Sequence, residues 1–224
     1  MPKAPIFLLT LLLSSCGFAP SDEEEAQVKQ DPAPNQSQPQ LLETAVVNQS
    51  SSLTPEAQSP RLAAEGGQAK AQLALGKMYE LGEGVPQDDT QAAEWYHKAA
   101  LQGDDEAQFL LGLRYDRGLG VPQSYSESMK WGLAAAEQGY PLAQNYVGWR
   151  YIQGTPKGQD YGKAAQWFRR AAEQGDPEAQ YNLGVVYSRG IGLEQSSTQA
   201  MAWFGKAAEQ GYAPALALTK KLSE

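Results

Sequence analysis

The fold is decided by one stretch, Ala69–Asp104, which reads AKAQLALGKMYELGEGVPQDDTQAAEWYHKAALQGD. Its pattern returns three more times without a gap, so that equivalent residues lie 36 positions apart between residues 68 and 211. The recurring large residues are the tryptophans Trp95, Trp131, Trp167 and Trp203 and the tyrosines Tyr79, Tyr115, Tyr151 and Tyr187. A fixed period of this length is typical of stacked supersecondary units that share one continuous core.

Each unit predicts two helices. In the first unit, Gln68–Leu81 places its small and apolar residues within one angular sector at about 100° per residue, and Gly82 follows as a helix-ending residue. The second helix of each unit is expected to begin after a good N-capping residue, namely Asp88, Ser124, Asp160 and Ser196. Ser124 and Glu127 have the spacing of a capping box. The unit is therefore a helix-turn-helix.

Glycine recurs inside the first helix of every unit, at Gly76, Gly112, Gly148 and Gly184. A glycine in a helix interior costs about 1 kcal/mol relative to alanine, so we expect a compensating close contact with an adjacent helix. In the second unit, Gly132 replaces the large residue that follows tryptophan. We expect a small void there.

The pattern resembles the Sel1-like repeat, a relative of the tetratricopeptide repeat. The quoted stretch follows that family's order of alanine, leucine-glycine, tyrosine, glycine-x-glycine, tryptophan-tyrosine and lysine-alanine-alanine. The resemblance implies an all-α fold, a right-handed α-solenoid, and a role as an adaptor that binds other proteins along the curved surface of the array. The expected repeat domain is 61–224, with repeats 68–103, 104–139, 140–175 and 176–211 and a C-terminal cap, 212–224.

A capping helix is expected before the first repeat. Ala63, Ala64 and Gly67 lie one period before the end of a second helix, and Ser59 and Pro60 have the character of an N-cap and a first helical residue.

The N-terminus has the layout of an export signal, residues 1–15. Lys3 precedes a short apolar run, Ile6–Leu13, which is too short to span a bilayer because that requires about 20 residues. Leu13-Ser14-Ser15-Cys16 resembles the lipobox of bacterial lipoproteins, which implies cleavage before Cys16 and its lipidation. The alternative is an ordinary cleaved signal in which this cysteine is incidental. Gly17 in place of aspartate favours, by the same resemblance, the outer membrane facing the periplasm.

Residues 16–60 predict a disordered linker, because they are rich in Gln, Pro, Ser and acidic residues and hold few large apolar groups. Residues 17–60 carry seven acidic residues against one lysine, and residues 61–224 carry nineteen acidic against sixteen basic residues. Neither part has the basic surface that nucleic-acid binding needs.

The sequence offers few candidate catalytic residues. A single cysteine and a single histidine, His97, exclude a His/Cys metal site. The glycine-x-glycine turns follow helices and not strands, so they do not predict a phosphate loop. We therefore expect no enzymatic activity and no cofactor.

A binding surface is predicted from first-helix residues that differ between repeats while the scaffold residues stay fixed. The candidate partner-binding residues are Arg114, Arg117, Tyr146, Trp149, Arg150 and Arg189. Arginine and aromatic residues dominate interface hot spots, and the arginines are conspicuous in an acidic protein. The alternative is solvation and ordinary pairing with Asp116 or Glu106 within the same repeat.

Two functions follow. The first is an envelope scaffold, anchored to the membrane by lipid, that binds a protein or peptide in assembly or secretion. The alternative is a cell-wall protein that binds or hydrolyses peptidoglycan or β-lactams.

Overall fold

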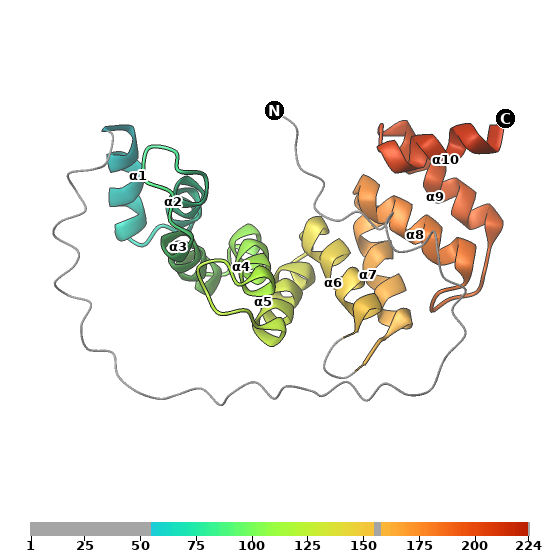
Figure 1. Ribbon diagram of the computed structural model, residues 1–224, viewed down its shortest axis with the longest axis horizontal. Coiled ribbons are helices and arrows are strands. Elements are labelled where there is room, and N and C mark those ends of the chain that lie inside the picture. Colours follow the sequence, from blue (N-terminus) through green and yellow to red (C-terminus); the bar gives the residue numbers. More distant parts are fainter. Residues whose placement is uncertain (1–54, 155–157, 224) are drawn as a thin grey trace. The chain divides into compact units, whose positions relative to one another are not determined.

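The computed structural model describes residues 55–154 and 158–223, and within these ranges the chain forms ten α-helices (Figure 1). The helices are α1 (Pro55–Glu65), α2 (Ala69–Leu81), α3 (Asp89–Leu101), α4 (Asp105–Arg117), α5 (Tyr125–Glu137), α6 (Pro141–Gln153), α7 (Tyr161–Glu173), α8 (Pro177–Arg189), α9 (Ser197–Glu209) and α10 (Ala213–Ser223). The predicted signal peptide, Cys16 and most of the predicted linker lie outside the described residues.

The helices are arranged in chain order. Each helix packs against the one before it and the one after it, and the tightest pairs are the two helices of one repeat: α2 with α3, α4 with α5, α6 with α7 and α8 with α9 (Figure 1). Helix α1 packs on α2 and α10 packs on α9. The predicted all-α solenoid of four helix-turn-helix repeats between capping helices is therefore confirmed.

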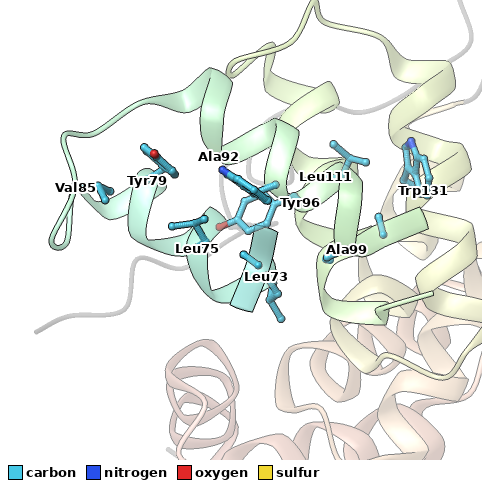
Figure 2. Packing of buried hydrophobic residues seen from close by; sticks show 13 residues of the cluster. Leu73, Leu75, Tyr79, Val85, Ala92, Tyr96, Ala99, Leu111 and Trp131 are labelled. Atoms are coloured by element: carbon cyan, nitrogen blue, oxygen red, sulfur yellow. The ribbon is translucent and has the colours of Figure 1, made fainter. Parts of the chain in front are cut away.

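The hydrophobic core is continuous between the first two repeats. Leu75 of α2, Tyr96 of α3 and Leu111 of α4 belong to one buried cluster, which Trp131 of α5 joins (Figure 2). Full burial of a large apolar side chain contributes about 1.5 to 3 kcal/mol. Because residues of two repeats share this cluster, neither repeat buries its apolar face alone.

The four predicted N-caps form, each accepting a hydrogen bond from a backbone N–H of the helix that it begins: Asp88, Ser124, Asp160 and Ser196. The predicted capping box is wrong in its second half. The Ser124 N–H donates to the carbonyl of Tyr115 at 2.9 Å, so it does not need the carboxylate of Glu127. Glu127 instead pairs with Lys130 at 3.0 Å.

The first-helix glycines make the close contact that the sequence predicted. A Cβ atom at Gly76 would lie 2.7 Å from the Tyr96 ring, and one at Gly148 would lie 2.8 Å from the Phe168 ring. Such distances are too short for carbon atoms, so glycine allows the first helix of these two repeats to approach the aromatic residue of the second helix. In the second repeat a Cβ atom at Gly112 would instead lie 3.1 Å from the backbone carbonyl oxygen of Ser128. The packing contact between the two helices compensates the conformational entropy that glycine loses in a helix.

The void expected at Gly132 is absent, because the next repeat fills it. A Cβ atom at Gly132 would lie 3.1 Å from the ring of Tyr146, which comes from α6 and is 2% exposed. The hydroxyl groups of Tyr146 and Ser128 are hydrogen-bonded at 2.5 Å. Tyr146 therefore replaces, from the following repeat, the large residue that α5 lacks.

A ladder of buried glutamines, which was not among the features predicted from the repeat pattern, links successive helices. Gln108 of α4 donates from Nε2 to the carbonyl of Ala100 in α3 at 3.1 Å. Its Oε1 accepts from Nε2 of Gln138, which follows α5, at 2.8 Å. The same two bonds recur at Gln72, Gln144 and Gln180. One side chain thus ties three consecutive helices together.

The start of α1 differs from the prediction. The helix begins at Pro55, so Pro60 lies within it and not at its first position. Proline suits the first helical position because its φ is fixed and it has no N–H to satisfy, and Pro55 occupies that position. Pro60 removes one interior backbone bond, and the helix continues through it.

Substitutions at Gly132 and Tyr146 test the filled void. Gly132→Tyr should lower the free energy of unfolding by about 1 to 3 kcal/mol through overpacking, and Tyr146→Leu by about 2 to 4 kcal/mol through the cavity that it leaves. The double variant recreates the pair Tyr96 and Leu110, found one period earlier, so it should recover most of both losses. Urea unfolding of the four proteins gives the coupling energy. If the decrease in the free energy of unfolding of the double variant equals the sum of the two single decreases, Tyr146 does not fill the space beside Gly132.

Candidate functional site

The structure divides the six predicted partner-binding residues by accessibility. Arg114, Tyr146 and Trp149 are buried, with 4%, 2% and 8% of their surface exposed. Arg150 is half-buried, and Arg117 and Arg189 are exposed. The set therefore does not form a single open surface.

Arg114 joins two repeats inside the array. Its Nη2 lies 2.8 Å from Oε1 of Glu80 in α2, and its Nη1 lies 2.5 Å from Oδ1 of Asp89 in α3. Glu80 also accepts a hydrogen bond from the hydroxyl of Tyr96. Burial by itself would lower the pKa of Arg114, but the two carboxylates raise it above its ordinary value. Arg114 is thus a paired, buried cation of the scaffold.

Arg150 occupies the equivalent place one repeat later. Its Nη1 lies 3.1 Å from Oδ1 of Asp116, and its guanidinium lies 4.7 Å from the ring centre of Tyr125. The alternative to a binding role was pairing within one repeat. Arg150 does pair with Asp116, but the two residues belong to different repeats, so the ion pair joins two repeats. At the following junction Val186 and Ile152 hold these positions, so the ion pair is replaced by apolar residues.

An exposed row remains on the first helices. Its members occupy the last helical position of α2, α4, α6 and α8 and are Leu81, Arg117, Gln153 and Arg189. We call these four residues the arginine row. Neither Arg117 nor Arg189 forms an ion pair with another described residue. Each lies at a helix C-terminus, where a cation is favoured, and each is accessible to an acidic partner.

A second distinctive region lies at the junction of α6 and α8. Asn145 is 4% exposed and Asn182 is 1% exposed, and Nδ2 of Asn182 donates to Oδ1 of Asn145 at 2.9 Å. Oδ1 of Asn182, Oε1 of Glu178 and Nε1 of Trp149 are buried without a hydrogen-bond partner among the described residues. We call Asn145, Trp149, Glu178 and Asn182 the polar junction.

Burial raises the pKa of Glu178 to about 7, and the neighbouring Asp176 carboxylate adds to the shift, whereas a hydrogen bond with Asn145 opposes it. Burial also raises the pKa of Asp176. Asn145 and Glu178 were not among the residues predicted from the sequence. The available signal was a polar residue at positions that are apolar one repeat earlier, where Phe109 and Leu142 stand.

The only histidine of the sequence is an exposed residue of α3. The His97 ring packs edge-on against Trp131, with 5.7 Å between the ring centres. Among the described residues no group of three or more His, Cys, Asp and Glu side chains could hold a metal ion. No helix in this part of the chain is long and apolar enough to cross a bilayer.

Comparison with known proteins places these features in a family. A family model described as Sel1 repeat matches residues 69–104, 105–140, 141–176 and 177–212. These ranges start one residue after the predicted repeats. The period is the same in both, and only the residue chosen as the start of each repeat differs. Among curated proteins, no sequence matches the chain.

Two solved structures resemble the array. One is a protective antigen of uropathogenic Escherichia coli strains that displays an SLR fold, with 42% identity over 69% of this chain and a TM-score of 0.67. The other is a Sel1 repeat protein of Oxalobacter formigenes, with 39% identity over 74% of this chain and the same TM-score. The matched region covers 33% of the first protein and 48% of the second.

The raised pKa of Glu178 predicts a pH dependence of stability. Its folded pKa of about 7 exceeds the ordinary value of 4.5, so the folded state holds the proton more tightly. Stability should therefore fall as the pH rises from about 4.5 to 7, by about 1 to 3 kcal/mol because the carboxyl is only partly buried. Asp176 contributes in the same direction.

Urea unfolding at pH 5, 6, 7 and 8 measures the slope of the free energy of unfolding against pH. Glu178→Gln should flatten it, whereas the control Glu106→Gln, at a carboxylate paired with Lys77, should leave it unchanged. An unchanged slope in Glu178→Gln would contradict the assignment.

Proposed function

Because the chain belongs to the Sel1 repeat family, whose members are generally protein-interaction scaffolds, we propose that it is a non-catalytic scaffold that binds a protein or peptide partner along its first helices. The observation that carries this proposal is the arginine row. Its two arginines are exposed and free of ion pairs with described residues, whereas Arg114 and Arg150 are held by carboxylates of the preceding repeats.

The chemistry of the row favours a partner that presents acidic or hydrogen-bond-accepting groups. Arginine offers five donors in a rigid fork that matches a carboxylate. Arg117 and Arg189 lie at the same helical position two repeats apart, with Gln153 between them. Such regular spacing suits an extended segment that crosses several repeats.

The proposed location is the bacterial envelope. The support is the sequence of residues 1–16: an apolar signal followed by the lipobox-like Leu13-Ser14-Ser15-Cys16. Lipidation at Cys16 would hold the array at a membrane through the linker, since two or more acyl chains give stable anchoring. Gly17 favours the outer membrane. The Escherichia coli relative is a protective antigen, which accords with an envelope location.

Capture of the partner tests the scaffold function. Crosslinking in intact cells, followed by purification and mass spectrometry, identifies the partner, and the purified pair gives an affinity. Replacing Arg117 and Arg189 together by alanine should weaken binding about 10-fold or more, because each hot-spot residue contributes at least about 1 to 2 kcal/mol. Thermal unfolding should barely change, since both side chains are exposed.

The matched control is Arg170→Ala, at an exposed arginine of the second helix α7. It should leave the affinity unchanged. Equal affinity of the double variant and the wild type would reject the arginine row as the binding surface.

A second experiment tests the anchor. Cys16→Ser should move the folded protein from the membrane fraction to the soluble fraction and abolish incorporation of radioactive palmitate. If the variant remains as firmly membrane-bound as the wild type, lipidation at Cys16 is the wrong explanation for the location.

A further inference from the structure

The chain segments that follow α4 and α8 begin with the same pattern, arginine-glycine-aliphatic-glycine. It reads Arg-Gly-Leu-Gly at residues 117–120 and Arg-Gly-Ile-Gly at residues 189–192. We call these two segments the arginine turns. Each presents its exposed arginine and, two residues later, an aliphatic side chain: Leu119 is 36% exposed, and Ile191 is half-buried. The first and third repeats have leucine and glutamine in place of the arginine.

The two arginine turns have the same backbone conformation. The glycine that caps α4 and the glycine that caps α8 both have φ 69° and ψ 35°. In the first turn, Nε2 of Gln123 donates to the carbonyl of Asp116 at 2.8 Å. The equivalent bond in the second turn, from Gln195 to Ser188, measures 2.7 Å. The array therefore presents its two exposed first-helix arginines on turns of one geometry.

Each arginine turn also lies directly on the preceding repeat. A Cβ atom at Gly120 would overlap the carbonyl oxygen of Asp89, at the start of α3. A Cβ atom at Gly192 would overlap the carbonyl oxygen of Tyr161, at the start of α7. Both glycines have a positive φ, 72° and 70°, which residues with a side chain rarely adopt. The contact holds both turns in place before a partner binds, which reduces the entropy lost on binding.

The separation of the two turns follows from the packing of the first helices. Ion pairs join neighbouring first helices near their C-terminal ends, from Arg114 to Glu80 and from Arg150 to Asp116. Neighbouring helices lie about 8 to 10 Å apart, so turns that are two repeats apart are separated by about 20 Å. An extended chain advances about 3.3 Å per residue and covers this separation in about six residues.

We propose that the two arginine turns bind an extended segment of the partner protein that carries two acidic residues about six positions apart, each beside an apolar residue. Each guanidinium pairs with one carboxylate, and Leu119 or Ile191 contacts the neighbouring apolar side chain. The support is charge complementarity, because Arg117 and Arg189 are exposed and form no ion pair with a described residue. This inference rests on the proposed scaffold function and specifies the sequence pattern of the partner.

NMR titration of the purified full chain with designed peptides tests the proposal. The probe is an acetylated and amidated peptide in which a glutamate-leucine pair stands at each end of a run of four serines. Two control peptides replace one glutamate or the other by glutamine. The two-glutamate peptide should shift the side-chain Nε–H signals of Arg117 and Arg189 in a saturable way. It should bind about 10-fold more tightly than either control, because each control lacks one charge-assisted pair.

Single variants assign each glutamate to one turn. Arg117→Ala should abolish the advantage of one glutamate over glutamine and keep that of the other, and Arg189→Ala should do the reverse. Arg170→Ala, at an exposed arginine of α7, should leave all three affinities unchanged. Equal affinities of the three peptides, or an equal effect of each variant on both glutamates, would overturn the proposal.

The acidic linker of the chain itself is the competing occupant. If the signals of Arg117 and Arg189 respond to removal of residues 17–54 and not to the two-glutamate peptide, the proposal is wrong, because the linker then occupies the turns. The capture experiment has a separate readout. If the captured partner loses affinity for the variant that lacks both arginines while the peptides bind equally, the scaffold function stands and the two-carboxylate pattern is rejected.

Discussion

The glutamine ladder is the constraint on which the rest of the array depends. Each member donates to the last turn of the preceding repeat and accepts from the glutamine that ends its own repeat, as Gln108 does with Ala100 and Gln138. A buried amide that loses its partners costs about 1 to 3 kcal/mol. A change in the step between repeats would break these bonds at every junction, so the ladder fixes one separation and one register along the chain.

Because the separation between repeats is fixed, residues that differ between repeats fall into two groups: those that contact the neighbouring repeat and those that stay exposed. Some differences are absorbed by the neighbouring repeat: Tyr146 fills the space at Gly132, and Arg114 pairs with Glu80 and Asp89. Others remain at the surface, as Arg117 and Arg189 do. A residue that departs from the repeat pattern is therefore a binding candidate only after its partners within the array are known.

The period alone was sufficient to predict the helices of the four repeats, the N-caps of the second helices and the close contacts at Gly76 and Gly148, because these features are set within one repeat. The filling of the space at Gly132 and the pairing of Arg150 with Asp116 each involve side chains of two repeats. The spacing of residues within one repeat does not show that such side chains come into contact. The ladder was predictable in principle, since its glutamines recur every 36 residues. The buried polar groups at Asn145 and Glu178 required the structure, because the same residue types are ordinary on an exposed helix face.

The positions that recur in every repeat form the scaffold, and the recognition surface that we propose lies on the first helices. Site-specific photocrosslinking in cells tests this separation most directly. A photoreactive amino acid at Gln153, in the arginine row, is compared with one at Gln166, which is also an exposed glutamine and belongs to the second helix α7. We expect the partner to be crosslinked from position 153 and not from position 166. Crosslinking from position 166 alone would contradict this expectation, since the partner would then lie on the second helices.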